Sequence, residues 1–213
     1  MRKINPFHRL LIEADAALRT LAPPNMRECT RVNPAHDIPD APLTAPEKKH
    51  IAGLMRVNHA GEVCAQALYR GQALTAKLEM VRAQMNEAAI EEIDHLAWCE
   101  ARLIELKSTP SLFNPFWYAG SWLIGAFAGL IGDKWSLGFV AETERQVTRH
   151  LEHHLKQLPD QDKKTHAILS QMKTDEIAHA ELALNAGAAN LPFLIQRLMY
   201  AISKVLTQSS YHL

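Results

Sequence analysis

The chain is poor in cysteine and carries no block of like charges. It has three cysteines in 213 residues, Cys29, Cys64 and Cys99, and no Cys-x-x-Cys spacing. A structural zinc or iron–sulfur site is therefore not expected, and a reducing compartment fits the unpaired thiols. Basic and acidic residues number 23 each, so the formal net charge is zero. Without a basic cluster, the chain gives no sign of binding nucleic acid.

Three other signals are missing. The first residues, Met1–Pro6, lack the apolar core of a secretory signal, and Glu13 and Asp15 interrupt the apolar residues that follow. The Gly-x-Gly-x-x-Gly fingerprint of nucleotide-binding folds is absent. Little of the sequence shows the alternation of a β-strand. With 47% hydrophobic residues at this length, one sizeable α-helical domain is expected.

The hydrophobic pattern and the prolines divide the chain into helices and connections. We separate an N-terminal part, residues 1–45, from the main domain, residues 46–213. The N-terminal part has a short amphipathic helix at 5–21 and an extended connection at 22–46, whose prolines are Pro23, Pro24, Pro34, Pro39, Pro42 and Pro46. In the main domain we expect helices at about 45–77, 80–107, 134–157, 162–189 and 191–208. A capping box of Thr44 and Glu47 opens the first of these.

Two copies of one pattern lie in the main domain. They are Glu62 followed by Glu92 and His95, and Glu144 followed by Glu176 and His179. The gaps between the glutamates are similar, 92 − 62 = 30 and 176 − 144 = 32 residues. A Glu and a His three positions apart share one helix face, so both can bind one centre. Ferritin-like proteins with a dinuclear carboxylate site use this ligand set, and the pattern therefore predicts a ferritin-like four-helix bundle around a metal pair.

Helical neighbours indicate which glutamates point inward. Glu144 and Glu92 share their faces with apolar residues, whereas Glu142 lies near two arginines and Glu91 near mostly polar residues. We therefore expect Glu142 and Glu91 on the surface. Four unpaired carboxylates in a core would be very costly, and a pair of divalent metals removes that cost. Carboxylates with one imidazole per metal suit iron or manganese better than zinc or copper, and six ligands leave positions open for oxygen chemistry.

The remaining polar residues near the pattern have weaker assignments. His59 lies one turn before Glu62 and could hydrogen-bond to a metal ligand, but a satisfied core histidine is an equal alternative. Tyr69 could bond to a ligand carboxylate or simply pack in the core. The other helical histidines lie in a charged stretch and are expected on the solvated surface: His150, His153, His154 and His166.

Residues 110–132 form an uncharged segment of 23 residues. Its length alone permits a transmembrane helix. However, a single crossing would place Glu92 and Glu144 on opposite sides of the bilayer. We therefore expect a long apolar crossover that packs on the bundle or dips into one leaflet, next to an amphipathic last helix. Candidate contacts to a membrane or a lipid-like substrate tail are Trp117, Trp122, Leu123 and Phe127, and ordinary bundle packing is the alternative.

Four runs of sequence resemble one family. Asn58–Glu62, Glu91–His95, Val140–Glu144 and Asp175–His179 are similar to runs of the Coq7 family, the di-iron demethoxyubiquinol hydroxylases of ubiquinone biosynthesis. The resemblance covers about residues 45–213. It implies two iron ions per chain, held by the six residues of the duplicated pattern, with no catalytic residue outside these ligands. The implied reaction is dioxygen-dependent ring hydroxylation of a 2-polyprenyl-3-methyl-6-methoxy-1,4-benzoquinol.

The resemblance also implies partners and a location. The enzyme would need an electron donor, and other proteins of ubiquinone biosynthesis are expected partners. Its water-insoluble substrate would bring it to the cytoplasmic face of the bacterial inner membrane as a peripheral protein. A rubrerythrin-like peroxidase, a manganese catalase and a ferritin-like iron-storage protein use similar ligands, but none of them accounts for the apolar crossover. A metal-free helical scaffold would leave the carboxylates unpaired.

Overall fold

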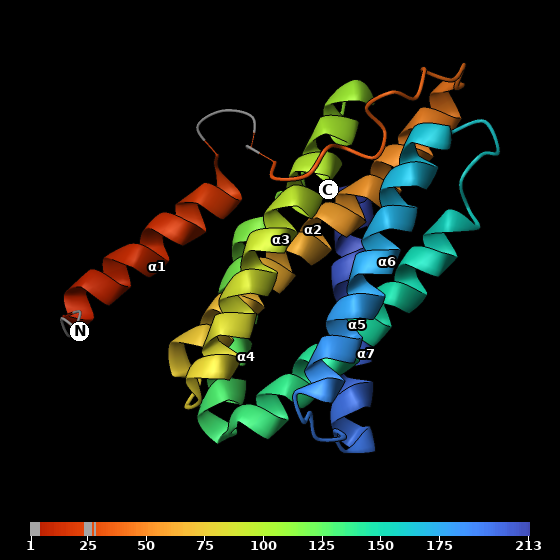
Figure 1. Ribbon diagram of the computed structural model, residues 1–213. Helices are drawn as coiled ribbons and strands as arrows, with labels where there is room; N and C mark the ends of the chain where they lie inside the picture. Colours follow the sequence, from red (N-terminus) through yellow and green to blue (C-terminus); the bar gives the residue numbers. More distant parts are fainter. Residues whose placement is uncertain (1–4, 24–26, 28) are drawn as a thin grey trace.

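The computed structural model describes residues 5–23, 27 and 29–213, and every regular element in these ranges is an α-helix (Figure 1). The helices are α1 (Pro6–Leu21), α2 (Ala45–Thr75), α3 (Glu79–Glu105), α4 (Asn114–Ile131), α5 (Asp133–Leu155), α6 (Lys163–Asn185) and α7 (Phe193–His212). The predicted all-α fold class is therefore confirmed. Pro24 of the proline-rich connection and Met1–Ile4 of the first residues lie outside the described residues.

The predicted helices are all present, with differences at their ends. α2 begins at the predicted capping box: the Glu47 N–H donates to Thr44 Oγ1 at 3.4 Å, and the Thr44 N–H donates to the Glu47 carboxylate at 2.7 Å. α6 ends four residues early, at Asn185 rather than 189, because the chain turns at Gly187 with a φ of 95°. α7 continues to His212, four residues beyond the predicted 208.

Helices α2, α3, α5 and α6 form a four-helix bundle whose apolar core is divided in two along its length (Figure 1). One cluster includes Ile51, Met55, Trp98, Leu103, Leu151 and Met172, and the other includes Tyr69, Val81, Met85, Leu137, Val140 and Ala183. On each of the four helices, the residues of the duplicated pattern lie between these clusters. Apolar packing on both sides therefore encloses a polar layer in the middle of the bundle.

The uncharged segment forms a helix of its own, α4, which packs against α2. The two helices approach closely, since a Cβ atom at Gly71 would overlap the backbone of Trp122 and one at Gly125 would overlap the backbone of Leu68. The glycines of this segment thus serve close helix contact. The crossover lies where the sequence predicts it, and no described helix is long and apolar enough to cross a membrane.

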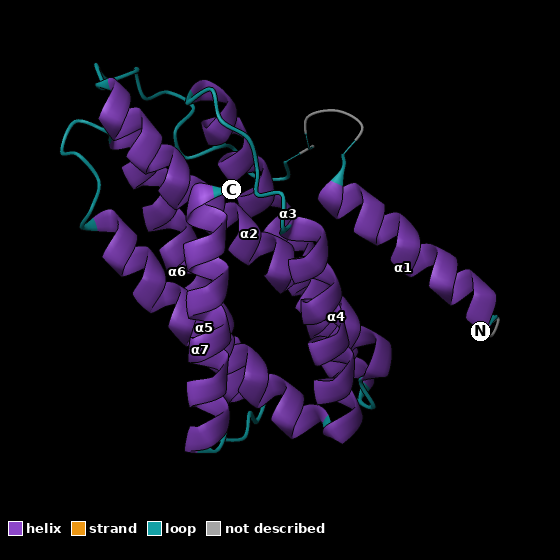
Figure 2. Ribbon diagram, turned by 180° about the vertical axis from the view of Figure 1, so that it is seen from behind, coloured by secondary structure: helices purple, strands orange, loops and turns teal. Residues whose placement is uncertain are grey.

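The terminal helices differ in how much they contact the bundle. α7 lies beside the bundle on the same side as α4, whereas α1 stands apart at the N-terminal end (Figure 2). α1 is tethered by Glu13, whose carboxylate accepts hydrogen bonds from Arg70 at 3.1 Å and from Trp122 Nε1 at 3.3 Å. The connection after α1 contributes Ala35 to the core. The boundary at residue 45 stays a prediction, but these contacts join the two parts.

Candidate metal centre

Each helix of the bundle brings part of the duplicated pattern to one buried place. Glu62 comes from α2, Glu92 and His95 from α3, Glu144 from α5, and Glu176 and His179 from α6. These residues are between 0% and 7% exposed. Their potential ligand atoms form two groups, each within 4.8 Å: Glu62, Glu92, His95 and Glu176 in one, and Glu144, Glu176 and His179 in the other. The structure thus brings together the six residues that the sequence singled out.

Carboxylates orient His95 from both sides of its ring. Nδ1 lies 2.9 Å from Glu92 Oε2 and 3.4 Å from Glu176 Oε1, whereas Nε2 lies 2.9 Å from Asp175 Oδ2. Burial alone would lower the pKa of His95, but Glu92 and the hydrogen bond to Asp175 raise it well above its usual value. One ring nitrogen therefore faces the carboxylate group, and Asp175 holds the other.

His179 has the same arrangement with a different partner. Nδ1 lies 3.4 Å from Glu92 Oε1, and Nε2 lies 2.5 Å from Glu91 Oε2. Burial would lower the pKa of His179, but the neighbouring carboxylates of Glu176 and Glu92 raise it to about 12. Glu91 is half-exposed, as expected of a residue at the surface, and it also contacts a residue of the cluster.

The two carboxylates that hold the histidines each contact a histidine on a different helix from their own. Asp175 precedes Glu176 on α6 but holds the histidine of α3, and Glu91 precedes Glu92 on α3 but holds the histidine of α6. Sequence reasoning missed both residues. The signal was present, because an acidic residue directly precedes Glu-x-x-His in both copies of the pattern. Such carboxylates fix which ring nitrogen faces a metal.

Glu92 and Glu176 lie between the two groups. Glu92 directs one oxygen to each histidine, and Glu176 does the same at 3.4 Å from His95 and 3.6 Å from His179. Burial alone would raise the pKa of both, but the histidines lower the pKa of Glu92 well below its usual value, and hydrogen bonds lower that of Glu176. These contacts therefore favour the ionised form of both central carboxylates.

Glu62 and Glu144 lie at the outer sides of the cluster. Burial, together with a neighbouring carboxylate, raises the pKa of each well above its usual value. Tyr69 donates a hydrogen bond to Glu144 Oε1, which decides between the two alternatives for this tyrosine. Burial raises the pKa of the Tyr69 phenol as well, so it stays a donor.

The structure favours the core alternative for His59. Its ring nitrogens lie 3.2 Å from Glu100 and 3.2 Å from Asn114, not beside the cluster. The expectation that Glu142 lies on the surface was wrong, since it is 6% exposed. Its carboxylate accepts a hydrogen bond from Gln146, whose amide also donates to a backbone carbonyl of α7. Gln146 thus links Glu142 to α7, and Glu142 stays outside the cluster.

The expectation for the four other histidines was right for two of them. His153 and His166 are exposed. His154 is buried, with Nδ1 at 3.0 Å from Asn58 Oδ1, and burial lowers its pKa to about 2. His150 packs edge-on against His154 with ring centroids 3.9 Å apart, and burial lowers its pKa to about 4. His154 thus contacts α2 and His150 contacts His154, and the local sequence reveals neither contact.

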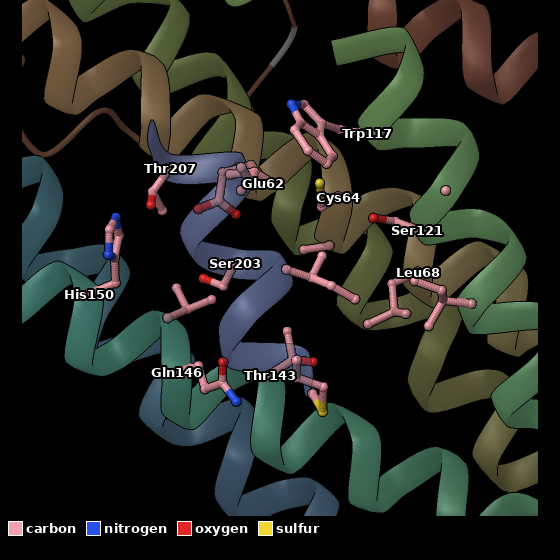
Figure 3. Close-up of a pocket in the computed structure, with 18 of the residues that line it drawn as sticks. Glu62, Cys64, Leu68, Trp117, Ser121, Thr143, Gln146, His150, Ser203 and Thr207 are labelled. Atoms are coloured by element: carbon pink, nitrogen blue, oxygen red, sulfur yellow. The ribbon is translucent and has the colours of Figure 1, made fainter. Parts of the chain in front are cut away.

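A cavity of about 300 Å³ leads to Glu62 between α2, α4, α5 and α7. Figure 3 shows Glu62, Trp117 and His150 around it, on α2, α4 and α5. Its walls are mainly apolar: Val57, Ala65, Leu68, Ile124, Phe139, Val147, Met199 and Leu206. Among its polar atoms, Trp117 Nε1 and His150 Nε2 are buried without a hydrogen-bond partner in the described part of the chain. The centre is thus reached through an apolar chamber.

A second cavity, of about 250 Å³, meets the cluster from another direction. Tyr69 and His179 line it, together with Gln84, Glu87 and Glu91 of α3. It lies between α2, α3, α5 and α6, so it opens on the His179 side of the centre. The His95 side, in contrast, is closed by Trp98, whose ring lies 5.4 Å from that of His95.

Comparison with known proteins decides the family. The family model for the ubiquinone biosynthesis protein COQ7 matches residues 49–210. The chain belongs to the Coq7 family. It is 62% identical to the 3-demethoxyubiquinol 3-hydroxylase of Legionella pneumophila (strain Corby) and 57% identical to that of Acinetobacter baylyi, over 213 residues and 100% of each chain. The family resemblance found in the sequence is therefore confirmed.

A solved structure supports the fold of this Coq7 member. The bacterioferritin-related protein from Bacteroides fragilis, described as a dodecameric thioferritin, matches with a TM-score of 0.53 at 20% identity. The match covers 65% of this chain and 84% of that chain. It confirms the predicted ferritin-like fold and carries no information on function.

The residues of the Coq7 centre fit a pair of divalent metals. Glu92 Oε1, Glu176 Oε2 and His179 Nδ1 are buried and lack a hydrogen-bond partner among the described residues. Metal ions would satisfy these atoms, which otherwise cost free energy. The four buried carboxylates carry four negative charges when ionised, which two divalent cations would balance.

Proposed function

We propose that this member of the Coq7 family is a 3-demethoxyubiquinol 3-hydroxylase. It converts one ring C–H of a polyprenyl methoxybenzoquinol to C–OH with one atom of dioxygen, and two electrons and two protons reduce the other atom to water. The observation that carries the proposal is the full-length similarity to hydroxylases of this name, in a chain whose buried cluster opens onto an apolar chamber. The electrons come from the quinol or from a donor protein.

Two iron ions are the proposed cofactors. Glu62 and His95 would hold one ion, Glu144 and His179 the other, and Glu92 and Glu176 face both positions. When bound, the metal pair supplies the activation of dioxygen. Protein purified after growth with iron should contain about two irons per chain, the number that the charge balance requires. One metal per chain in a fully loaded preparation would contradict the proposed pair.

The chamber that reaches Glu62 is the proposed quinol site. Its apolar walls suit a polyprenyl tail and exclude water from the ring. Trp117 Nε1 can donate a hydrogen bond to a ring oxygen, and neutral His150 can donate or accept one through Nε2. These two groups would orient the ring, and Glu62 marks the end of the chamber at which the reacting carbon lies. This proposal gives Trp117 a contact with the ring, whereas its predicted contact with the membrane or the substrate tail stays a prediction.

The exposed side chains of α4 and α7 support a peripheral membrane location. Both helices border the chamber and lie on one side of the bundle (Figure 2). Both carry exposed apolar residues. These residues are Phe116, Leu123, Phe127, Leu130, Phe193, Leu194, Leu198 and Val205. Leu123 and Phe127 are 63% and 65% exposed, as a membrane contact requires, whereas Trp122 is half-buried against α1 and α2. A long-tailed quinol partitions into lipid, so the enzyme must draw it from there.

Vesicle flotation tests the membrane contact. Leu123→Ser with Phe127→Ser should release the protein from vesicles, since two apolar side chains would leave the lipid. Ile104→Ser with Leu182→Ser is the matched control, because these side chains are similarly exposed on α3 and α6. Helix content by circular dichroism should stay unchanged in both variants. Equal vesicle binding by both double variants would argue against the α4–α7 surface.

Quinone profiling tests the reaction. A strain that lacks this protein should accumulate the demethoxy quinone and lose ubiquinone, and the wild-type chain should restore it. Glu144→Ala should fail to restore ubiquinone, whereas Glu181→Ala, on the exposed side of α6, should restore it fully. Unchanged ubiquinone in the deletion strain would refute the proposed substrate.

A further inference from the structure

The connection between α1 and α2 reaches the metal centre through Thr30 and Arg31, which we name the strap. Thr30 donates from its backbone N–H and from its hydroxyl to Asp94, each at 2.7 Å. Arg31 Nε donates to the same carboxylate at 3.0 Å. Asp94 is 1% exposed, so the strap provides the charge and hydrogen bonds that a buried carboxylate needs. The strap is therefore docked on α3.

Arg31 also reaches α6. Its Nη1 donates to Asp175 Oδ2 at 2.8 Å, across 144 positions of sequence. The same oxygen of Asp175 lies 2.9 Å from His95 Nε2, and His95 Nδ1 faces the cluster. Arg31 thus stands at the outer end of a continuous chain of contacts that ends at a candidate metal ligand. Its fork-shaped guanidinium can serve two carboxylates on different helices at once.

A second contact reaches His95 from another direction. The Arg31 guanidinium lies 4.9 Å from the centroid of the Trp98 ring, and the Trp98 ring lies 5.4 Å from that of His95. Both neighbours that hold the outer side of His95 are therefore themselves held by Arg31. His179 has no such support in the described residues, because its partner Glu91 is half-exposed and forms no ion pair with an arginine or lysine.

We propose that Arg31 is a positioning residue of the metal centre, and that docking of the strap and metal binding at the His95 position stabilise each other. Arg31 aligns Asp175 and Trp98, which keep His95 Nδ1 directed at the metal position. Coupling of this kind is reciprocal, so a bound metal also holds the strap in place. The family model matches from residue 49, so the strap lies outside the matched segment. The proposal rests on the proposed metal pair and not on the hydroxylation.

Metal titration of the metal-free protein tests the proposal. Cobalt(II) is the probe, and Arg31→Gln is compared with Arg27→Gln. Arg27 is the matched control because it is a buried cation of the same connection, paired with Glu100 at 2.9 Å, and does not touch Asp175 or Trp98. Loss of a direct partner of a metal ligand typically weakens binding about 10- to 100-fold. Arg31 lies one contact further out, so we expect a loss of about three- to tenfold for one of the two ions.

Hydrogen exchange gives a readout that does not depend on activity. In the wild type, cobalt should slow amide exchange in the peptide around residues 30–36, and Arg31→Gln should abolish this effect. Arg31→Lys guards against a folding defect, because it keeps a charge beside Asp94 but cannot bridge two carboxylates in the same way. It should show an intermediate affinity with wild-type helix content.

Each outcome bears on a different claim. A wild type that binds no cobalt would refute the metal pair and the strap proposal together. A wild type that binds two ions, with the same affinities in Arg31→Gln and Arg27→Gln, would overturn the strap proposal alone. Equal losses in both variants would also overturn it, because any displacement of the connection would then suffice.

Discussion

The two halves of the metal centre carry the same motif in different surroundings. His95 packs against Trp98 and contacts Asp175, which is paired with Arg31. His179 instead borders a cavity and contacts the half-exposed Glu91. A duplicated sequence pattern thus does not give two equivalent positions. Because the supporting groups come from different helices and from the strap, the His95 half should be the more rigid and the His179 half the more accessible.

The largest effect should follow from the loss of a carboxylate that faces both metal positions. Glu176 faces both histidines, so Glu176→Ala should reduce the iron content below one ion per chain and abolish hydroxylation. Iron analysis and quinol turnover measure the two effects. Glu181→Ala, also on α6 but exposed, is the control and should keep both at the wild-type level. Retention of one firmly bound ion in Glu176→Ala would show that the halves are more independent than their shared carboxylates suggest.

Substitutions of Asp175 and Glu91, which each hold the histidine of the other helix, should affect the two metal positions differently. Asp175→Asn should weaken binding of one metal ion by about 10- to 100-fold, since His95 loses its charged partner, which is only 14% exposed. Glu91→Gln should weaken binding of the other ion less, because water can take the place of a half-exposed carboxylate. Cobalt titration of both variants measures the difference. A larger loss in Glu91→Gln than in Asp175→Asn would reverse the proposed order of rigidity.

A pH experiment tests the burial of His154, a histidine outside the metal cluster. Burial lowers the pKa of His154 to about 2, so the folded protein binds its proton less readily than the unfolded chain does. The full free energy of unfolding is therefore present above about pH 6.5, the pKa of a histidine in the unfolded chain. As the pH falls below this value, His154 lowers the free energy of unfolding by about 1.4 kcal/mol per pH unit. Urea unfolding between pH 7 and pH 5 should therefore show a shallower loss in His154→Gln than in the wild type. Identical slopes would mean that His154 is accessible to protons in the folded state.

The smallest effect is expected at Glu142. This glutamate is buried but contacts Gln146 and the exposed Arg149 rather than the cluster, so Glu142→Gln should leave the iron content unchanged. The free energy of unfolding of this variant should fall by only about 1 kcal/mol, the value of an ordinary hydrogen bond. Iron analysis and urea unfolding test both statements. A loss of iron in this variant would place Glu142 within the centre.

The sequence alone determined the four bundle helices and the six residues that converge, because helical periodicity and the Glu-x-x-His spacing act within one helix. The family resemblance rested on four short runs of sequence. The sequence did not reveal that Glu91 and Asp175 hold the histidines of each other's helices, since that depends on how α3 and α6 face one another. Nor did it place Arg31 beside Asp175, 144 positions away. Nor did it show that Gln146 links Glu142 to α7, or that buried His154 contacts Asn58 of α2. Only tertiary packing decides such contacts, because residues distant in sequence leave no periodic signal of their meeting.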